Sequence, residues 1–121
     1  MMNLFEVALD YALLHTPAWG RLMVCQRGGE GFGYRLHAKV PVISVPSAPA
    51  DPVNLSRLAW LFGRHAVRVD GPASIDPASD AWKEAESIFT DLCLLSDQPA
   101  DASVFEQQRA AVLGPVSTAV H

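Results

Sequence analysis

Cys25 and His37 are the two residues of this sequence whose types could form a nucleophile and its general base. Each lies in a stretch that favours a β-strand, so the two side chains could face each other across a hairpin. A turn centred near residues 29–31 would, however, place Cys25 opposite residue 35 or 36 rather than opposite His37. Apolar neighbours also indicate that Cys25 is buried, whereas a nucleophilic cysteine needs an electropositive, partly exposed setting. We therefore expect no catalytic residues, and an enzyme of an unrecognised family that uses Cys25 or His37 stands as the alternative.

A glycine-rich segment, Gly28 to Gly33, could let backbone amides approach a phosphate group. A dinucleotide-binding fingerprint requires such a segment to lead from a strand into a helix, and this one leads into a second strand. A kinase glycine loop does join two strands, but the sequence has no H-R-D or D-F-G segment and is too short for that fold. We interpret the segment as a hairpin turn and expect no cofactor.

The four histidines show no metal-ligand spacing, so we expect no metal site. His15 and His65 fall near the expected C-terminal ends of helices, where an imidazolium interacts favourably with the helix dipole. The two cysteines, Cys25 and Cys93, form no CxxC pair and lie in apolar runs, which favours buried free thiols.

Arg57 and Arg64 are seven residues apart and would share one face of a helix, which Arg68 would join if the helix continued past Gly63. Such a row of arginines could hold phosphates or an acidic protein patch. Trp60 lies beside them, off the apolar stripe of the same helix. An exposed tryptophan next to arginines has the composition of an interface hot spot, so Arg57, Trp60 and Arg64 are candidate binding residues.

The charge of the chain is unevenly distributed. The net charge is −4, yet residues 1–69 carry an excess of Lys and Arg, and residues 70–121 hold most of the Asp and Glu. A mildly acidic protein is not expected to bind nucleic acid directly. The acidic half could instead face a basic partner, which makes Asp97, Asp101 and Glu106 further candidate binding residues.

Periodicity and capping signals predict the elements. A helix is expected over 4–15, opened by Asn3 with Glu6 and ended by Pro17. Residues 19–27 and 32–40 are expected to pair as a hairpin, followed by a short strand over 42–45 that Pro41 places at a strand start or a sheet edge. Further expected elements are a helix from Asp51-Pro52 to about Gly63, a strand over 67–69, a turn at 70–72, a helix over 80–95, and a helix from Ser103 with Glu106 to Leu113 that Gly114-Pro115 ends.

These elements predict an α+β domain, in which an antiparallel sheet of three to four strands packs against three to four helices in the order α-β-β-(β)-α-β-α-α. One domain over 1–115 is expected, with a disordered tail over 116–121. The N-terminal segment contains Glu6 and Asp10 and lacks a basic start, so we expect no signal peptide, and no apolar run is long enough for a membrane span.

The absence of a catalytic or metal-binding constellation leads to a functional hypothesis. We expect a cytoplasmic, non-enzymatic protein-binding domain that acts as an inhibitor or adaptor by occupying the surface of another protein, and a homodimer is compatible with this reading. The element order resembles that of small inhibitor proteins from phages and other mobile elements, which implies a host nucleic-acid-handling or defence complex as the target. It also resembles that of acidic secretion chaperones, which gives a second alternative function.

Overall fold

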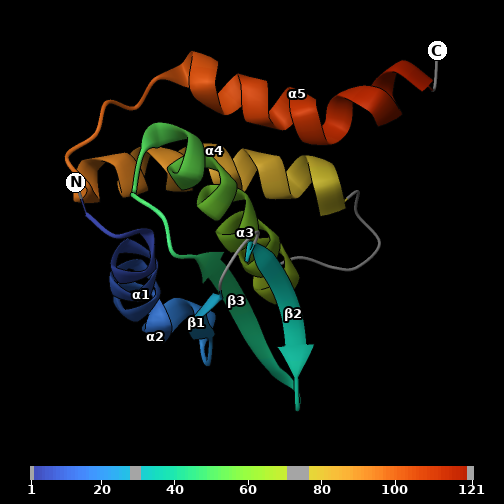
Figure 1. Ribbon diagram of the computed structural model, residues 1–121. Helices are drawn as coiled ribbons and strands as arrows, with labels where there is room; N and C mark the ends of the chain where they lie inside the picture. Colours follow the sequence, from blue (N-terminus) through green and yellow to red (C-terminus); the bar gives the residue numbers. More distant parts are fainter. Residues whose placement is uncertain (1, 28–30, 71–76, 120–121) are drawn as a thin grey trace.

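Helices precede and follow a block of consecutive strands in a computed structural model that describes residues 2–27, 31–70 and 77–119 (Figure 1). The elements are α1 (Leu4–Leu14), α2 (Thr16–Trp19), β1 (Met23–Arg27), β2 (Gly33–His37), β3 (Val40–Pro46), α3 (Pro52–Asp70), α4 (Pro77–Leu95) and α5 (Ala102–Ala119). The expected α+β class is confirmed, with the element order α-α-β-β-β-α-α-α.

The sheet has three strands in the order β1-β3-β2 and is mixed rather than antiparallel. β1 pairs with β3 in parallel, and β2 pairs with β3 in the antiparallel direction. The expected hairpin between 19–27 and 32–40 is therefore wrong, because β3 lies between the two strands. The expected strand over 42–45 is present, but it forms the centre of the sheet and not an edge.

A two-residue turn closes the hairpin that does form, between β2 and β3. Ala38 and Lys39 both have positive φ, 50° and 69°, which is the conformation of a tight hairpin turn that follows the strand twist. The glycine-rich segment that was expected to turn the chain lies in part, at residues 28–30, outside the described residues.

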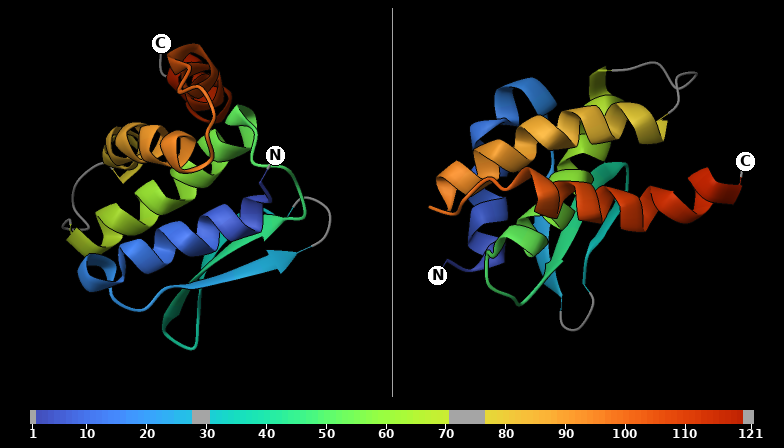
Figure 2. Two further views of the ribbon diagram at one scale, coloured as in Figure 1. Left: turned by 90° about the vertical axis from the view of Figure 1, so that its left-hand side faces the viewer. Right: turned by 90° about the horizontal axis from the view of Figure 1, so that it is seen from above.

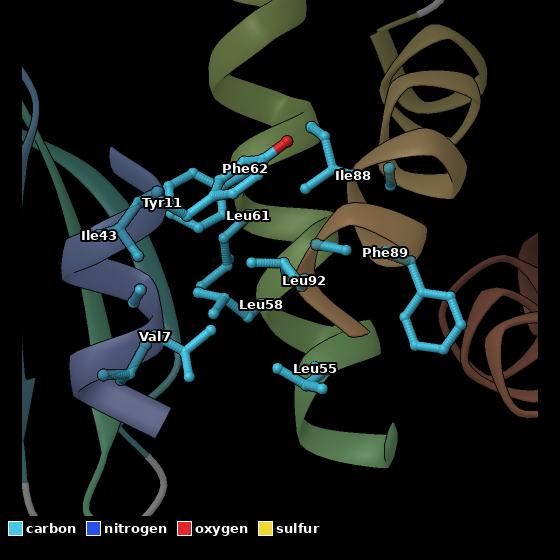
Figure 3. Close-up of a cluster of buried hydrophobic side chains, with 14 of the residues drawn as sticks. Val7, Tyr11, Ile43, Leu55, Leu58, Leu61, Phe62, Ile88, Phe89 and Leu92 are labelled. Carbon is cyan, nitrogen blue, oxygen red and sulfur yellow. The ribbon is translucent and has the colours of Figure 1, made fainter. Parts of the chain in front are cut away.

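The helices stack on one face of the sheet in two further layers (Figure 2). α1 contacts β1 and β3, α3 contacts β3 and β2, and α4 packs on the outer side of α3 together with α5. Figure 3 shows the resulting core, in which side chains of α1, β3, α3 and α4 converge; those labelled are Val7, Tyr11, Ile43, Leu55, Leu58, Leu61, Phe62, Ile88, Phe89 and Leu92.

The N-terminal helices depart from expectation around Pro17. Asn3 caps α1 as expected, because its side chain accepts a hydrogen bond from the Phe5 backbone N–H at 2.8 Å. Pro17 does not lead into a strand but lies in the short helix α2, where the first positions need no N–H donor. Trp19, expected in a strand, ends α2 and is buried against Phe62.

The helix α3 continues well past its expected end. Asp51 opens it as expected by accepting a hydrogen bond from the Asn54 N–H at 2.8 Å. Gly63 does not end it. A Cβ atom at this position would lie 2.4 Å from the Ala81 carbonyl oxygen, so the missing side chain allows α3 and α4 to cross closely. The expected strand over 67–69 is wrong, since these residues belong to α3.

The connection between α4 and α5 uses both kinds of helix cap. At the end of α4, Asp97 adopts φ 55°, and the N–H groups of Asp97 and Gln98 donate to the carbonyls of Leu94 and Cys93. These two bonds form a Schellman motif.

At the start of α5 the cap is Asp101, rather than the expected Ser103. α5 then continues to Ala119, beyond the stop expected at Gly114-Pro115. The turn expected over 70–72 lies largely outside the described residues.

Candidate functional site

The arginines predicted on α3 lie beside aromatic rings of β2 and the residue before it. The Arg57 guanidinium carbon is 5.0 Å from the centre of the Phe32 ring, and that of Arg64 is 5.5 Å from the centre of the Tyr34 ring. Both distances fit cation–π contacts, which hold the two exposed guanidinium groups in place. We call these residues, together with Trp60, the arginine–aromatic surface. Sequence analysis predicted its α3 members, and it missed Phe32 and Tyr34.

Trp60 is half-buried rather than freely exposed. Its ring stacks on that of Trp82 from α4, with centroids 4.3 Å apart, and the Arg64 guanidinium lies 5.8 Å from its centre. Packing between two helices accounts for this tryptophan.

The three acidic candidates have local structural roles at the junction of α4 and α5. Asp97 supplies the left-handed residue of the Schellman motif. Asp101 accepts hydrogen bonds from the Ser103 hydroxyl and N–H, and these bonds lower the pKa of its carboxyl. Glu106 pairs with Arg109 at 3.4 Å. These contacts account for the positions of all three side chains without a binding partner. No described contact joins any of the three to the arginine–aromatic surface.

Cys25 and His37 are far apart. Cys25 is level with Ser44 of β3, whereas His37 is level with Val40, four residues away along that strand. With β3 between the two strands, these offsets put their Cα atoms about 16 Å apart. The structure therefore does not bring these residues together as a nucleophile–base pair.

The thiols differ in exposure. Cys93 is fully buried, as expected, and burial raises the pKa of its thiol to about 11. Cys25 is only partly buried, which corrects the expectation that both are buried, and both are free thiols.

The histidines occupy structural positions. His65 was expected near a helix end, but it lies buried within α3, and its Nδ1 is 2.9 Å from the Tyr34 hydroxyl oxygen. His15 does lie at the end of α1, stacked against Trp19 with ring centroids 4.5 Å apart. Among the described residues no group of three or more His, Cys, Asp or Glu side chains could hold a metal ion.

The sequence did not reveal an open depression of about 380 Å³ between the C-terminal parts of α1 and α4. We call it the leucine depression; it is lined by Tyr11, Leu14, His15, Asp91, Leu94 and Leu95. Leu14 and Leu94 are 67% and 75% exposed, although an exposed leucine leaves apolar surface in water. Leu13, next to Leu14, is 64% exposed.

Carboxylates lie beside this apolar surface. The Tyr11 hydroxyl donates a hydrogen bond to Asp91 Oδ2 at 3.1 Å. Burial, followed by the nearby charges of Asp91 and Glu84, raises the pKa of Tyr11, so the phenol remains a neutral donor. The depression thus combines apolar side chains with an exposed carboxylate that keeps acceptor capacity for a cation.

One sequence feature indicates part of the depression. The segment Leu92-Cys93-Leu94-Leu95 has more consecutive apolar residues than one helical face can bury, and Leu94 falls on the outer side. Leu14 is the last residue of α1 and is also exposed.

Comparison with known proteins gives no relative for this chain: no protein-family model, no curated protein and no solved structure matches it. No helix in the described part of the chain is long and apolar enough to span a membrane.

Proposed function

We propose that this protein is a non-enzymatic protein-binding domain, an inhibitor or adaptor that works by occupying a surface of its partner with the leucine depression. The observation that carries the proposal is the exposure of Leu14 and Leu94 on either side of one apolar depression. Single exposed leucines are common on protein surfaces, but apolar side chains grouped around a depression are typical of interaction sites.

The energy available at this surface is sufficient for an anchor. Covering one exposed leucine side chain contributes about 1.5–3 kcal/mol when the burial is complete. Leu14 and Leu94 come from different helices, so a partner side chain inserted between them would contact both. Two such leucines provide an apolar centre for the contact.

The charge of the rim indicates the chemistry of the partner. Asp91 lines the depression, and Glu84 lies two turns earlier on α4, close enough to act on Tyr11. A second copy of this chain would bring these carboxylates against each other. The complementary occupant is therefore a segment of another protein that carries apolar side chains together with a lysine or arginine.

Photo-crosslinking in native host cells tests the proposal. With the photoreactive amino acid benzoylphenylalanine at position 94, we expect one adduct, whose cross-linked peptide contains apolar and basic residues. Leu14→Asp should abolish this adduct, because it puts a charge into the apolar surface. Val53→Asp is the matched control, since Val53 is an exposed apolar residue on α3, and it should leave the adduct unchanged. Adducts with many proteins that Leu14→Asp does not affect would contradict the proposal.

A further inference from the structure

The strand β2 forms one edge of the sheet. In the order β1-β3-β2 it pairs with β3 over Gly33–His37, and no strand in the described ranges lies on its other side. Figure 1 shows β2 at the outer side of the sheet, with α1 on the opposite side of β3. An edge strand can accept an extended segment as an additional strand through backbone hydrogen bonds.

The backbone of Leu36 indicates that this edge can pair. Leu36 lies opposite Pro41, and His37 and Val40 flank the two-residue turn. Hydrogen-bonded and non-hydrogen-bonded pairs alternate along an antiparallel ladder, and Pro41 has no N–H to donate. The pair Leu36–Pro41 is therefore the non-hydrogen-bonded kind, which turns the N–H and C=O of Leu36 away from β3 and toward the open edge.

The arginine–aromatic surface flanks the same edge. Arg57 stands over Phe32 and Arg64 over Tyr34, and these two ring residues are two positions apart. Residues at this spacing point to the same side of a strand and are about 6.8 Å apart. Each cation thus lies over one of two rings that are two residues apart at the start of β2, and an added strand could match them with side chains at alternate positions.

These guanidinium groups retain their capacity for anions. Among the side chains that the structure describes, the one ion pair joins Arg109 and Glu106, so no described carboxylate pairs with Arg57 or Arg64. A guanidinium offers a fork of N–H donors that fits a carboxylate. Arg35 and Lys39, also exposed, add positive charge to β2 and its turn.

We propose that β2 accepts an extended acidic segment of a partner protein as a fourth strand, whose alternate carboxylates bind Arg57 and Arg64. The inference concerns a different surface from the leucine depression and does not depend on the proposed function. It gives the molecule two separate contact surfaces of opposite charge, one between α1 and α4 and one along β2 and α3.

A protein segment fits this surface better than a nucleic acid. Single-stranded nucleic acids bind through bases stacked on open aromatic rings. Here a guanidinium lies over the Phe32 and Tyr34 rings, and Trp60 is stacked on Trp82. Two arginines would also neutralise only about two phosphates, which gives weak binding to a single strand with a salt slope of roughly −1.4.

Fluorescence anisotropy with three probes tests the inference on the full chain. The probes are a labelled peptide that alternates threonine and glutamate, the same peptide with glutamine for glutamate, and a single-stranded oligonucleotide. We expect the glutamate peptide to bind at least about tenfold more tightly than the other two. Equal binding of the glutamine peptide would overturn the role of the arginines, and tighter binding of the oligonucleotide would overturn the choice of a protein segment.

Matched variants and amide exchange locate the binding. Arg57→Gln with Arg64→Gln should weaken the glutamate peptide at least about tenfold. Arg21→Gln with Lys83→Gln removes the same charge at exposed positions elsewhere and should change the affinity less than about twofold. Hydrogen exchange of the Leu36 amide, followed by NMR, should slow when the glutamate peptide binds. Equal weakening by both double variants, or an unchanged Leu36 amide, would exclude strand addition beside the arginines.

Discussion

Trp60 and Trp82 stack face to face, with ring centroids 4.3 Å apart and ring planes within 11° of parallel. The Trp82 ring in turn makes a T-shaped contact with Phe105 of α5, with ring centroids 5.4 Å apart. This row of rings connects the three C-terminal helices, and Phe105 also stacks on Phe89 of α4 with ring centroids 5.4 Å apart. The described contacts of Trp60 therefore support packing between α3 and α4 more directly than binding of a partner.

Trp60→Ala should lower the free energy of unfolding by about 2–3 kcal/mol, because a large half-buried ring and its stacking partner lose their contact. Chemical denaturation followed by circular dichroism measures this change. Trp60→Phe, which keeps a ring against Trp82, should recover more than half of the loss. A Trp60→Ala protein as stable as the wild type would show that the stack does not hold α3 and α4 together.

Gly63→Ala separates packing from helix propensity. Propensity alone predicts a gain of about 1 kcal/mol for alanine within a helix. The added Cβ would lie 2.4 Å from the Ala81 carbonyl oxygen and 3.1 Å from the Ala85 Cβ, so α3 and α4 would have to move apart. We expect a net loss of about 2 kcal/mol in denaturant unfolding. A stabilised variant would mean that the helices do not cross at Gly63.

Asp97→Gly should stabilise the protein by up to about 1 kcal/mol, since glycine adopts positive φ without the strain of a side chain. Asp97 holds φ 55° at the end of α4. A thermal melt gives the shift, and Asp97→Ala serves as the comparison, because it removes the same charge but keeps a Cβ. If both variants shift the melting temperature equally, charge rather than backbone strain is responsible.

Stability should fall as the pH rises above about 9. The Cys93 thiol ionises near pH 9 in the unfolded chain, but burial raises its pKa to about 11 in the folded protein. Between these values the unfolded state binds fewer protons, so each unit of pH lowers the free energy of unfolding by about 1.4 kcal/mol at most. The contribution is fully present below pH 9 and lost through pH 11.

Denaturation of wild type and Cys93→Ala at a series of pH values tests this linkage. The variant should be less stable at neutral pH, because a buried side chain is lost, but its stability should not decline from pH 9. Tyr11 has a raised pKa as well, so both proteins should lose stability above about pH 10. Parallel profiles between pH 9 and 10 would contradict the role of Cys93.

Local signals were sufficient to predict where α1 and α3 begin, but not where α3 and α5 end and not the sheet. The caps Asn3 and Asp51 act within a few residues, and both were predicted correctly. The hairpin was misplaced because glycines are the usual residues at positive φ, whereas the turn that closes it consists of Ala38 and Lys39, which carry no such signature.

The candidate sites show the same limit. Arg57, Trp60 and Arg64 share a helix, so their grouping could be predicted from spacing alone. The roles of Phe32 and Tyr34 and the leucine depression depend on which elements become neighbours in the fold. For the same reason α3 was expected to end at Gly63, because its close contact with Ala81 cannot be predicted from helix propensity. The sequence therefore predicts a group of surface residues when all of them lie on one helix or strand, and not when several elements contribute them.

The parallel pairing of β1 with β3 has a consequence for folding. The β2–β3 hairpin needs only a two-residue turn and can form within about 1–10 μs. β1 must instead pair with the edge of β3 that faces away from β2, so it joins the sheet in a separate step. Until β1 arrives, the side of β3 from Val42 to Val45 is an open and apolar strand edge. Another chain in the same state can pair with that edge, so refolding should lose yield to aggregation as the protein concentration rises.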